Sequence, residues 1–439
     1  MVSGRSRFAA LSLAAMVSAT ALLPLMLPPA AWAYDTELAR MYTAEKQWAY
    51  AAFEWRRILD KDPKNLEAQL GLADALSQNG NWVEAVRHLE VTRAKYPDAR
   101  LDVALGNAYL KAELYRKASE LYQSILETDR FNAGAYKGLK KVQDKLPKAD
   151  QKEAKKLLLD RALEAKKLAV QALKDADYDK AENYYEIVTL YRSPASLVND
   201  YAVASLLAGN SKRALFLLQR IAKQDDQRWE TFGNLGLTLL SVGKTYAAKQ
   251  QIEQAIALCD DKKNKARLYN NLGYVYEYAK QPTKAMFAYE HALQLDPKLY
   301  KAKQNLAYIV QDLGEYKRAI ELYKSLVVAR PKNAAEIYNN IGFVYELMDK
   351  PHSALDYYQR ALRANPKLQN TYFNLGTLYK KLGKLDKASE YYKHLTELEF
   401  LQVEMAGKPV TKETDTEKAE SPLFKFVDVF FSKEANLEV

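Results

Sequence analysis

Residues 270–297 read NNLGYVYEYAKQPTKAMFAYEHALQLDP, and residues 305–331 read NLAYIVQDLGEYKRAIELYKSLVVARP. The two stretches share a pattern that returns after about 34 residues, a period typical of stacked helical units. Each has Leu-Gly or Leu-Ala near its start, an aliphatic or aromatic residue four positions after that leucine, and alanines spaced along its second half. A proline closes each stretch. The pattern predicts two helices per unit with a short turn between them.

Packing accounts for these residue types. Leu272 and Tyr276 are four residues apart and form one apolar stripe on the first helix. Gly273, beside that stripe, allows the backbone of the second helix to approach closely where Ala285 faces it. Pro297 ends the second helix, because proline lacks an N–H and turns the preceding residue away from α geometry.

Ten copies of this unit follow one another between Leu38 and Tyr392, and they resemble the tetratricopeptide repeat of exported bacterial proteins. The clearest copies contain Tyr269, Leu272, Gly273, Tyr276, Ala285, Tyr289, Ala292 and Pro297; Tyr338, Ile341, Gly342, Tyr345, Ala354, Tyr358, Ala361 and Pro366; and Tyr372, Leu375, Gly376, Tyr379, Ala388 and Tyr392. The resemblance implies an all-α fold, a right-handed α-solenoid of helix-turn-helix units. It also implies that the first helices line a concave face.

The phase of the repeats and the composition predict the domain organisation. FNAGAYKGLKKV begins like a first helix, but no second-helix pattern follows it, which leaves a hinge or an insertion as alternatives. The expected segments are 1–33, a signal peptide; 34–132, three repeats; 133–161, a half-repeat and charged helical linker; 162–400, seven repeats; 401–421, a disordered linker; and 422–439, a C-terminal apolar element.

The first 33 residues are typical of an export signal. Arg5 and Arg7 precede an uncharged stretch from Phe8 to Leu27, and PPAAWA then predicts cleavage after Ala33. We therefore expect a periplasmic or secreted protein. The alternative is an uncleaved segment that anchors the chain to the inner membrane.

Composition and motifs argue against catalysis. The four histidines are isolated, no phosphate-binding loop or nucleophile motif is present, and the single cysteine, Cys259, has no motif around it. We therefore expect no enzyme activity, no metal and no cofactor. The formal charge of +10 falls to +8 without the two arginines of the signal, and export disfavours a nucleic-acid partner.

Asparagine recurs directly before the Leu-Gly position, but only in the C-terminal units. These asparagines are Asn234, Asn271, Asn305, Asn340 and Asn374. A carboxamide both donates and accepts hydrogen bonds, so it can hold a peptide group whatever the side chain beside it. Helix spacing of 8–10 Å against roughly 3.3 Å per extended residue predicts one asparagine for every third peptide bond or so.

Three residues further on, the same face carries Leu237, Tyr274, Tyr308, Phe343 and Thr377. Tyr274, Tyr308 and Phe343 suggest apolar pockets for a peptide or stacking on a sugar ring. The alternative for both sets is a structural role, in which the asparagines bond neighbouring helices and the aromatics pack between units. A carboxylate clamp is disfavoured, because Gly233 and Phe373 are among the residues found where that subgroup has lysine.

These patterns predict a non-catalytic scaffold for protein–protein interaction in the cell envelope, which binds an extended peptide on the C-terminal repeats. The alternative is a carbohydrate-binding or assembly factor in exopolysaccharide export or cell-wall biogenesis. We expect a protein or peptide partner, or a glycan, with membrane contact only through an uncleaved anchor or the C-terminal segment. LFKFVDVFF near the C-terminus is expected to cap the last repeat; its alternative is to occupy the groove.

Overall fold

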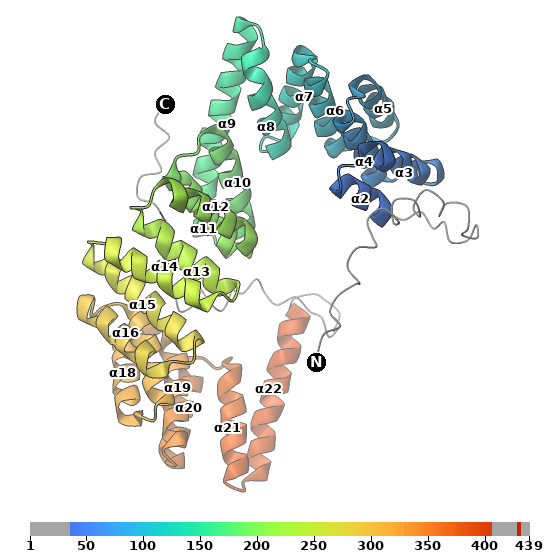
Figure 1. Ribbon diagram of the computed structural model, residues 1–439. Coiled ribbons are helices and arrows are strands. Elements are labelled where there is room, and N and C mark those ends of the chain that lie inside the picture. Colours follow the sequence, from blue (N-terminus) through green and yellow to red (C-terminus); the bar gives the residue numbers. More distant parts are fainter. Residues whose placement is uncertain (1–35, 330, 406–427, 432–439) are drawn as a thin grey trace, which may run out of the picture. The chain divides into compact units, whose positions relative to one another are not determined.

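The computed structural model describes residues 36–329, 331–405 and 428–431 (Figure 1). Within these residues the chain forms 21 α-helices that pack in consecutive pairs, which confirms the all-α repeat solenoid. None of the described helices combines the length and the apolar character needed to cross a membrane. The predicted signal peptide lies outside the described residues.

The chain divides into two compact units, Met1–Ala162 and Leu163–Val439. The described helices of the first unit are α2 (Thr36–Ala44), α3 (Trp48–Lys61), α4 (Leu66–Gln78), α5 (Trp82–Lys95), α6 (Ala99–Lys111), α7 (Tyr115–Thr128) and α8 (Ala133–Val142), followed by a 3₁₀ helix, η3 (Gln143–Lys145). Helix α9 (Lys148–Lys174) begins in this unit and ends in the second.

The second unit continues the same alternation. Its helices are α10 (Tyr178–Tyr191), α11 (Ala195–Leu207), α12 (Ser211–Gln224), α13 (Trp229–Ser241), α14 (Thr245–Leu258), α15 (Lys262–Tyr278), α16 (Pro282–Leu295), α17 (Tyr300–Asp312), α18 (Tyr316–Ala329), α19 (Ala334–Leu347), α20 (Pro351–Ala364), α21 (Gln369–Lys381) and α22 (Leu385–Met405), with a 3₁₀ helix, η4 (Pro331–Asn333).

Close contact between a glycine and an aromatic ring holds many of these pairs together. A Cβ atom built on Gly273 would lie 2.5 Å from the ring of Tyr289, and one built on Gly342 would lie 2.6 Å from the ring of Tyr358. Both tyrosines are fully buried, and the hydroxyl of each donates to a glutamate on the first helix. Any side chain at these glycines would collide with the ring, so the ring or the helices would have to shift.

The turns and the helix ends follow the predicted signals. Gly243 and Gly314 adopt φ values of +77° and +82° in the turns after α13 and α17, a conformation that glycine adopts without steric cost. Helix α16 ends at Leu295, just before Asp296 and Pro297. Proline therefore marks the end of this second helix, as the sequence predicts.

The break in the repeat phase lies at helix α9. Within the first unit, Tyr136 of α8 is buried and donates its hydroxyl hydrogen to the carbonyl oxygen of Leu158, 2.8 Å away on α9. Within the second unit, Ala169 of α9 belongs to the same apolar cluster as Tyr185 of α10. One long helix thus packs on α8 with its first part and on α10 with its last part.

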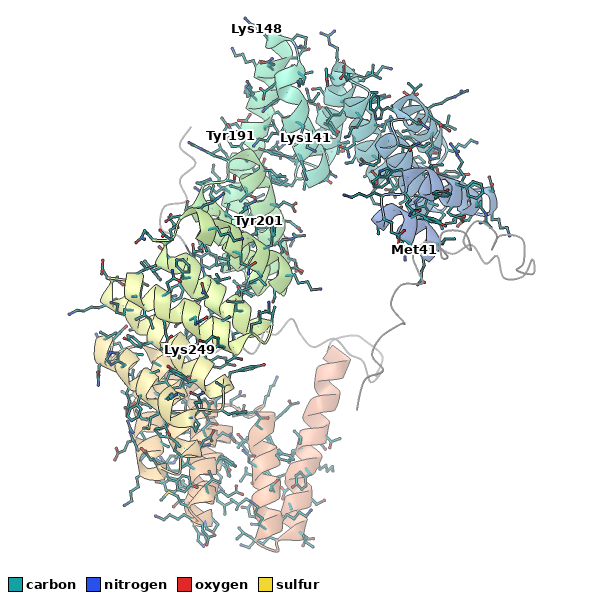
Figure 2. All side chains as sticks on the ribbon, viewed as in Figure 1. Met41, Lys141, Lys148, Tyr191, Tyr201 and Lys249 are labelled. Carbon is teal, nitrogen blue, oxygen red and sulfur yellow. The ribbon has the colours of Figure 1, made fainter. Side chains whose placement is uncertain are left out.

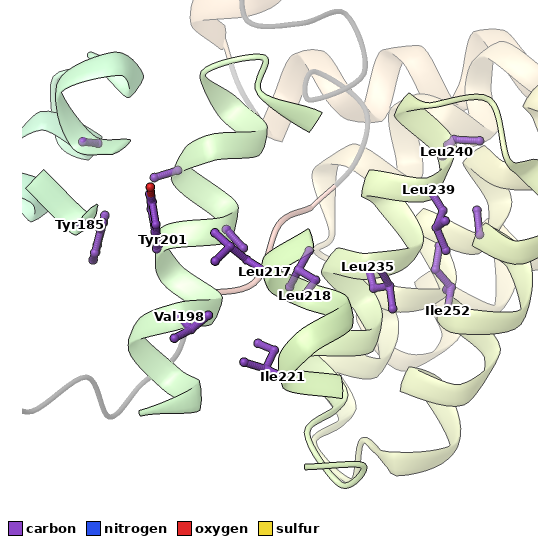
Figure 3. Close-up of a cluster of buried hydrophobic side chains, with 14 of the residues drawn as sticks. Tyr185, Val198, Tyr201, Leu217, Leu218, Ile221, Leu235, Leu239, Leu240 and Ile252 are labelled. Atoms are coloured by element: carbon purple, nitrogen blue, oxygen red, sulfur yellow. The ribbon is translucent and has the colours of Figure 1, made fainter. Parts of the chain in front are cut away.

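Apolar side chains from successive helices merge into continuous clusters. The largest described cluster in the second unit runs from α9 to α15 and includes Tyr201, Leu218 and Ile252 (Figure 3). Figure 2 shows the described side chains together, with Tyr201 inside the helix stack and Lys249 on its surface. Each helix pair therefore depends on its neighbours to cover its apolar face.

The C-terminal boundary differs from the prediction. Helix α22 continues to Met405, so residues 401–405 are helical, although we expected a disordered linker from residue 401. The rest of that expected linker lies outside the described residues. Of the predicted apolar element, residues 428–431 are described, and they are not helical.

We predict that Gly273→Ala destabilises the protein, although alanine normally stabilises a helix relative to glycine by about 1 kcal/mol. The added methyl group would overlap the Tyr289 ring, and overpacking typically costs about 1–3 kcal/mol. Urea unfolding followed by circular dichroism measures the change.

Tyr289→Leu supplies the control background, because the smaller side chain makes room for the methyl group. There Gly273→Ala should be neutral or stabilising, which gives a coupling between the two sites. Equal effects of Gly273→Ala in both backgrounds would contradict the role assigned to the glycine.

Candidate functional site

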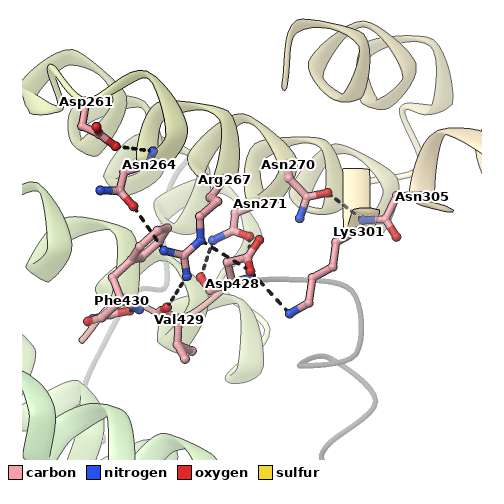
Figure 4. Close-up of polar contacts among 11 residues, drawn as sticks. Asp261, Asn264, Arg267, Asn270, Asn271, Lys301, Asn305, Asp428, Val429 and Phe430 are labelled. Carbon is pink, nitrogen blue, oxygen red and sulfur yellow. Dashed lines mark hydrogen bonds and ion pairs between the residues drawn. The ribbon is translucent and has the colours of Figure 1, made fainter. Parts of the chain in front are cut away.

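A short C-terminal segment lies against the repeats of the second unit. Asp428–Phe431, here called the tail segment, contacts α11, α13, α15 and α17. Figure 4 shows its contacts with Arg267, Asn271 and Lys301. The residues that hold it form what we call the asparagine face: Asn199 on α11, Asn234 on α13, Arg267 and Asn271 on α15, and Lys301 on α17. They come from four successive first helices.

Two asparagines pair with the main chain of the tail segment. The Asn271 side chain donates to the carbonyl oxygen of Asp428 at 2.7 Å and accepts from its N–H at 2.8 Å. Asn234 does the same with Phe430, at 2.8 and 2.9 Å. Pairing of residues two apart on one side is typical of an extended chain. Each carboxamide thus satisfies one complete residue of backbone.

Asn199 adds a third contact to the same backbone. Its side chain donates to the carbonyl oxygen of Phe430 at 2.9 Å, and its own oxygen accepts from Asn234 at 3.0 Å. The side chains of Asn199, Asn234 and Asn271 are fully buried. Because buried polar groups must find partners, the segment and the asparagines satisfy each other.

Arg267 contacts Asp428, Val429 and Phe430 of the tail segment. Its Nη2 donates to the carbonyl oxygen of Val429 at 2.9 Å, its Nε lies 3.6 Å from Oδ1 of Asp428, and its guanidinium lies 4.7 Å from the centre of the Phe430 ring. Asn264 on the same helix accepts from Arg267 Nη1 at 3.2 Å and so orients the side chain. Arginine suits this position because its planar group can donate and stack at once.

Phe430 occupies an enclosed aromatic site and is 2% exposed. Its ring meets Trp229 edge to face at 5.0 Å and belongs to a cluster with Phe232 and Leu268. A Cβ atom on Gly233 would lie 3.0 Å from this ring. The missing side chain of Gly233 is therefore part of what makes room for an aromatic residue.

The side chain of Asp428 is held by opposite charges, and that of Val429 by apolar contacts. Asp428 lies between Arg267 and Lys301, whose Nζ is 3.5 Å from Oδ1, and the aspartate side chain is 13% exposed. Val429 packs on the cluster that contains Leu237, against which Tyr274 also packs. Burial raises the pKa of Tyr274, so its hydroxyl stays neutral.

The remaining predicted residues make contacts between or within repeats. Asn305 donates to Asn270 at 2.9 Å, Asn374 to Asn339 at 3.0 Å, and Asn340 to the hydroxyl of Tyr308 at 3.0 Å. Phe343 is 40% exposed. Peptide binding by Asn305, Asn340, Asn374, Tyr308 and Phe343 stays a prediction for a longer ligand.

A simple rule connects the asparagines of neighbouring repeats. Asn234, Asn305 and Asn374 each donate to an asparagine of the preceding repeat, namely Asn199, Asn270 and Asn339. The residue that would receive Asn271 in this way is Gly233, which has no side chain. Gly233 thus leaves the Asn271 carboxamide available to the tail segment.

Two expectations need correction. Asn271 holds Asp428 and Asn234 holds Phe430, so the two bound residues are two positions apart along the segment, whereas we expected about three. Two extended residues span roughly 7 Å, which is less than the 8–10 Å between neighbouring helix axes. The described part of the tail also does not cap the last repeat. It lies on the asparagine face, because its backbone finds amide partners there and Phe430 finds an enclosed site.

Sequence reasoning missed Asn199, Trp229, Arg267 and Lys301. A usable signal existed for the two cations. The residue four positions before each recurring asparagine lies on the same helix face, and among Glu230, Arg267, Lys301, Glu336 and Asn370 only two are basic. Those two are the residues beside Asp428.

No cluster of potential metal ligands occurs among the described residues. Cys259 is buried in the same apolar cluster as Phe430, and burial raises the pKa of its thiol. A thiol held neutral is a poor nucleophile. The chemistry that this face offers is therefore hydrogen bonding, charge pairing and aromatic packing.

Family comparison agrees with the repeat pattern. Models described as "Tetratricopeptide repeat" match residues 42–102, 230–298, 301–367 and 334–398. The chain belongs to the tetratricopeptide-repeat family. Proteins of this family are mostly non-catalytic scaffolds for protein–protein interaction.

Individual relatives match parts of this tetratricopeptide-repeat protein. Tetratricopeptide repeat protein 8 of Caenorhabditis elegans is 26% identical over 166 residues, 38% of this chain and 30% of that protein. Uncharacterized protein ycf37 of Pyropia yezoensis is 31% identical over 121 residues, 26% of this chain and 68% of that protein. The solved structure of Pseudomonas aeruginosa pilF has 18% identity and a TM-score of 0.40, and it covers 49% of this chain and 97% of that chain.

We predict that Gly233→Asn releases the tail segment. The new Cβ atom alone would lie 3.0 Å from the Phe430 ring, so the ring would have to shift, and the amide would give Asn271 the partner that other repeats provide. Hydrogen exchange of the full chain should then show the Asp428 and Phe430 amides at least about 10-fold less protected, since both donate to asparagines.

Asn374→Ala is the matched control, because it removes the same side chain from the equivalent position of another repeat. It should leave the protection of both amides unchanged. Unchanged protection in Gly233→Asn would show that the glycine does not govern the site.

Proposed function

We propose that this protein is a non-catalytic scaffold that binds an extended segment of a partner protein on the asparagine face of its C-terminal repeats. The observation that carries the proposal is the pairing of Asn234 and Asn271 with complete residues of backbone. These contacts use only main-chain atoms of the segment. Such a face can therefore hold a polypeptide of another protein in the same way.

The chemistry of the contacts supports a peptide as the ligand. An extended chain offers an N–H and a C=O on the same side at every second residue, and Asn234 and Asn271 lie two residues apart along the segment. Arg267 adds a donor to the intervening carbonyl oxygen. Three successive residues are thus recognised through their backbone.

We place this function in the cell envelope. The support is the sequence of the first 33 residues, which combines Arg5 and Arg7 with a long uncharged stretch and a small-residue site before Tyr34. In the periplasm a single buried cysteine has no intrachain partner. Stability there depends on helix packing.

The main-chain contacts predict how N-methylation changes binding. The probe is a labelled peptide of residues 426–432, FVDVFFS, added to the full Phe430→Ala chain, whose own tail is weakened. Methylation of the nitrogen of its Asp, or of the Phe that directly follows its second Val, removes one hydrogen bond to an asparagine worth about 1 kcal/mol and should reduce affinity about 5-fold in fluorescence anisotropy.

Methylation at the intervening valine is the matched control and should be tolerated, because the contact at that residue uses its carbonyl oxygen. Asn234→Ala or Asn271→Ala in the protein should weaken the unmodified peptide about 30-fold, since each removes two hydrogen bonds worth about 1 kcal/mol each. Peptide binding that ignores all of these changes would refute recognition through the backbone.

The export proposal makes its own prediction. The protein expressed in its source cell should fractionate with the envelope, and N-terminal sequencing of the mature chain should begin at Tyr34. Ala33→Arg should block processing, because the cleavage site requires small residues. A chain that stays in the cytoplasmic fraction with Met1 retained would refute the proposal.

A further inference from the structure

The side chains of the tail segment carry information beyond the backbone contacts. Asp428 meets two cations, Val429 meets an apolar cluster, and Phe430 enters an enclosed aromatic site. Each of the three positions therefore imposes a different chemical requirement on whatever segment occupies the face.

The third position, occupied by Phe430, requires an aromatic ring. Phe430 is 2% exposed, with Trp229 edge-on at 5.0 Å and the Arg267 guanidinium 4.7 Å from the ring centre. A cation beside a ring face and an aromatic edge both favour a π system over an aliphatic side chain. Gly233 provides the space, where the other four repeats with the recurring asparagine have Asn270, Gln304, Asn339 and Phe373.

The requirement at the first position is a carboxylate. Nε of Arg267 and Nζ of Lys301 lie 3.6 and 3.5 Å from the same oxygen of Asp428. The side chains of both cations are 34% exposed and that of Asp428 is 13% exposed. Attraction between partly buried charges is screened less than attraction between exposed ones. A basic residue at this position would meet two like charges.

The second position accepts an apolar residue of moderate size. Val429 packs on a cluster formed by Leu206, Ala214 and Leu237, with Tyr274 beside it. Its carbonyl oxygen is held by Arg267 at 2.9 Å, which keeps the side chain directed toward that cluster. This apolar cluster therefore favours an aliphatic residue at the second position of a bound segment.

We propose that the asparagine face selects partner segments with an acidic, an aliphatic and an aromatic residue in succession, and that Asp428–Phe430 is an internal copy of this motif that a partner must displace. The proposal rests on the proposed function and names the ligand class of the same site. The face is then self-occupied until a better segment competes. Since a tethered segment acts at a high effective concentration, the intact chain binds a partner more weakly than a chain with a weakened tail.

The test compares the wild-type full chain with Phe430→Ala and with Asp428→Lys. The labelled peptide FVDVFFS should bind both variants at least about 10-fold more tightly than it binds the wild-type chain, because either change weakens the competing tail. Lys249→Ala, a substitution on the surface of α14 away from the asparagine face, is the control and should bind the peptide like the wild-type chain. Thermal melts of the variants check that the repeats remain folded.

Selectivity is measured on the Phe430→Ala chain with altered peptides. Peptides altered at one required residue each separate the three positions: Asp to Lys should weaken binding at least about 10-fold, and the phenylalanine directly after the second valine to Ala at least about 100-fold. Valine to Ile should have little effect. A conservative Asp to Glu change should retain most of the affinity.

Three results would overturn the proposal. Equal peptide affinity in wild-type, Phe430→Ala and Asp428→Lys chains would rule out self-occupancy, and equal affinity for all altered peptides would rule out the motif. A wild-type dimer that Phe430→Ala converts to a monomer in sedimentation would place the segment on a second copy of the chain. The proposed function fails separately, when N-methylated peptides and the Asn234→Ala and Asn271→Ala variants show no loss of binding.

Discussion

Glycine beneath an aromatic ring is the contact on which much of this structure depends. At Gly106, Gly273, Gly342 and Gly376 a Cβ atom would come within 2.5 to 2.7 Å of a tyrosine ring on the following helix. The ring fills the space that the glycine leaves, and the two helices pack at a short distance as a result. This contact sets the spacing of the two helices within a repeat, and stacking of successive repeats then brings asparagines from different repeats to one face.

The recurring asparagine has two uses in this chain, and Asn234 serves both, since it donates to Asn199 and pairs with Phe430. Asn305 and Asn374 donate to an asparagine of the preceding repeat and so help to join the repeats. Asn271 faces a repeat that has Gly233 in place of that partner, and it pairs with Asp428 instead. At Asn271 the missing side chain of Gly233 thus leaves the carboxamide to the segment alone.

The tail segment fits because its backbone pairs with carboxamides, Asp428 lies beside two cations and Phe430 enters an enclosed site. A peptide taken out of water needs partners for its N–H and C=O groups, and the carboxamides provide them. Arg267 combines three roles, since it donates to a carbonyl oxygen, neutralises Asp428 and lies against the Phe430 ring. Recognition therefore depends on a few side chains that come from successive first helices.

The sequence by itself determined the repeat, the helix pairs and the set of asparagines, because helix periodicity and the space left by glycine act over a few residues. It also indicated that those asparagines could hold an extended peptide. It did not distinguish Asn271 from Asn305, and it missed Asn199 and Trp229. Only the tertiary structure decided these points. Whether a carboxamide meets another repeat or a segment more than 150 positions away depends on neighbours that are distant in sequence, such as Asp428, 157 residues from Asn271.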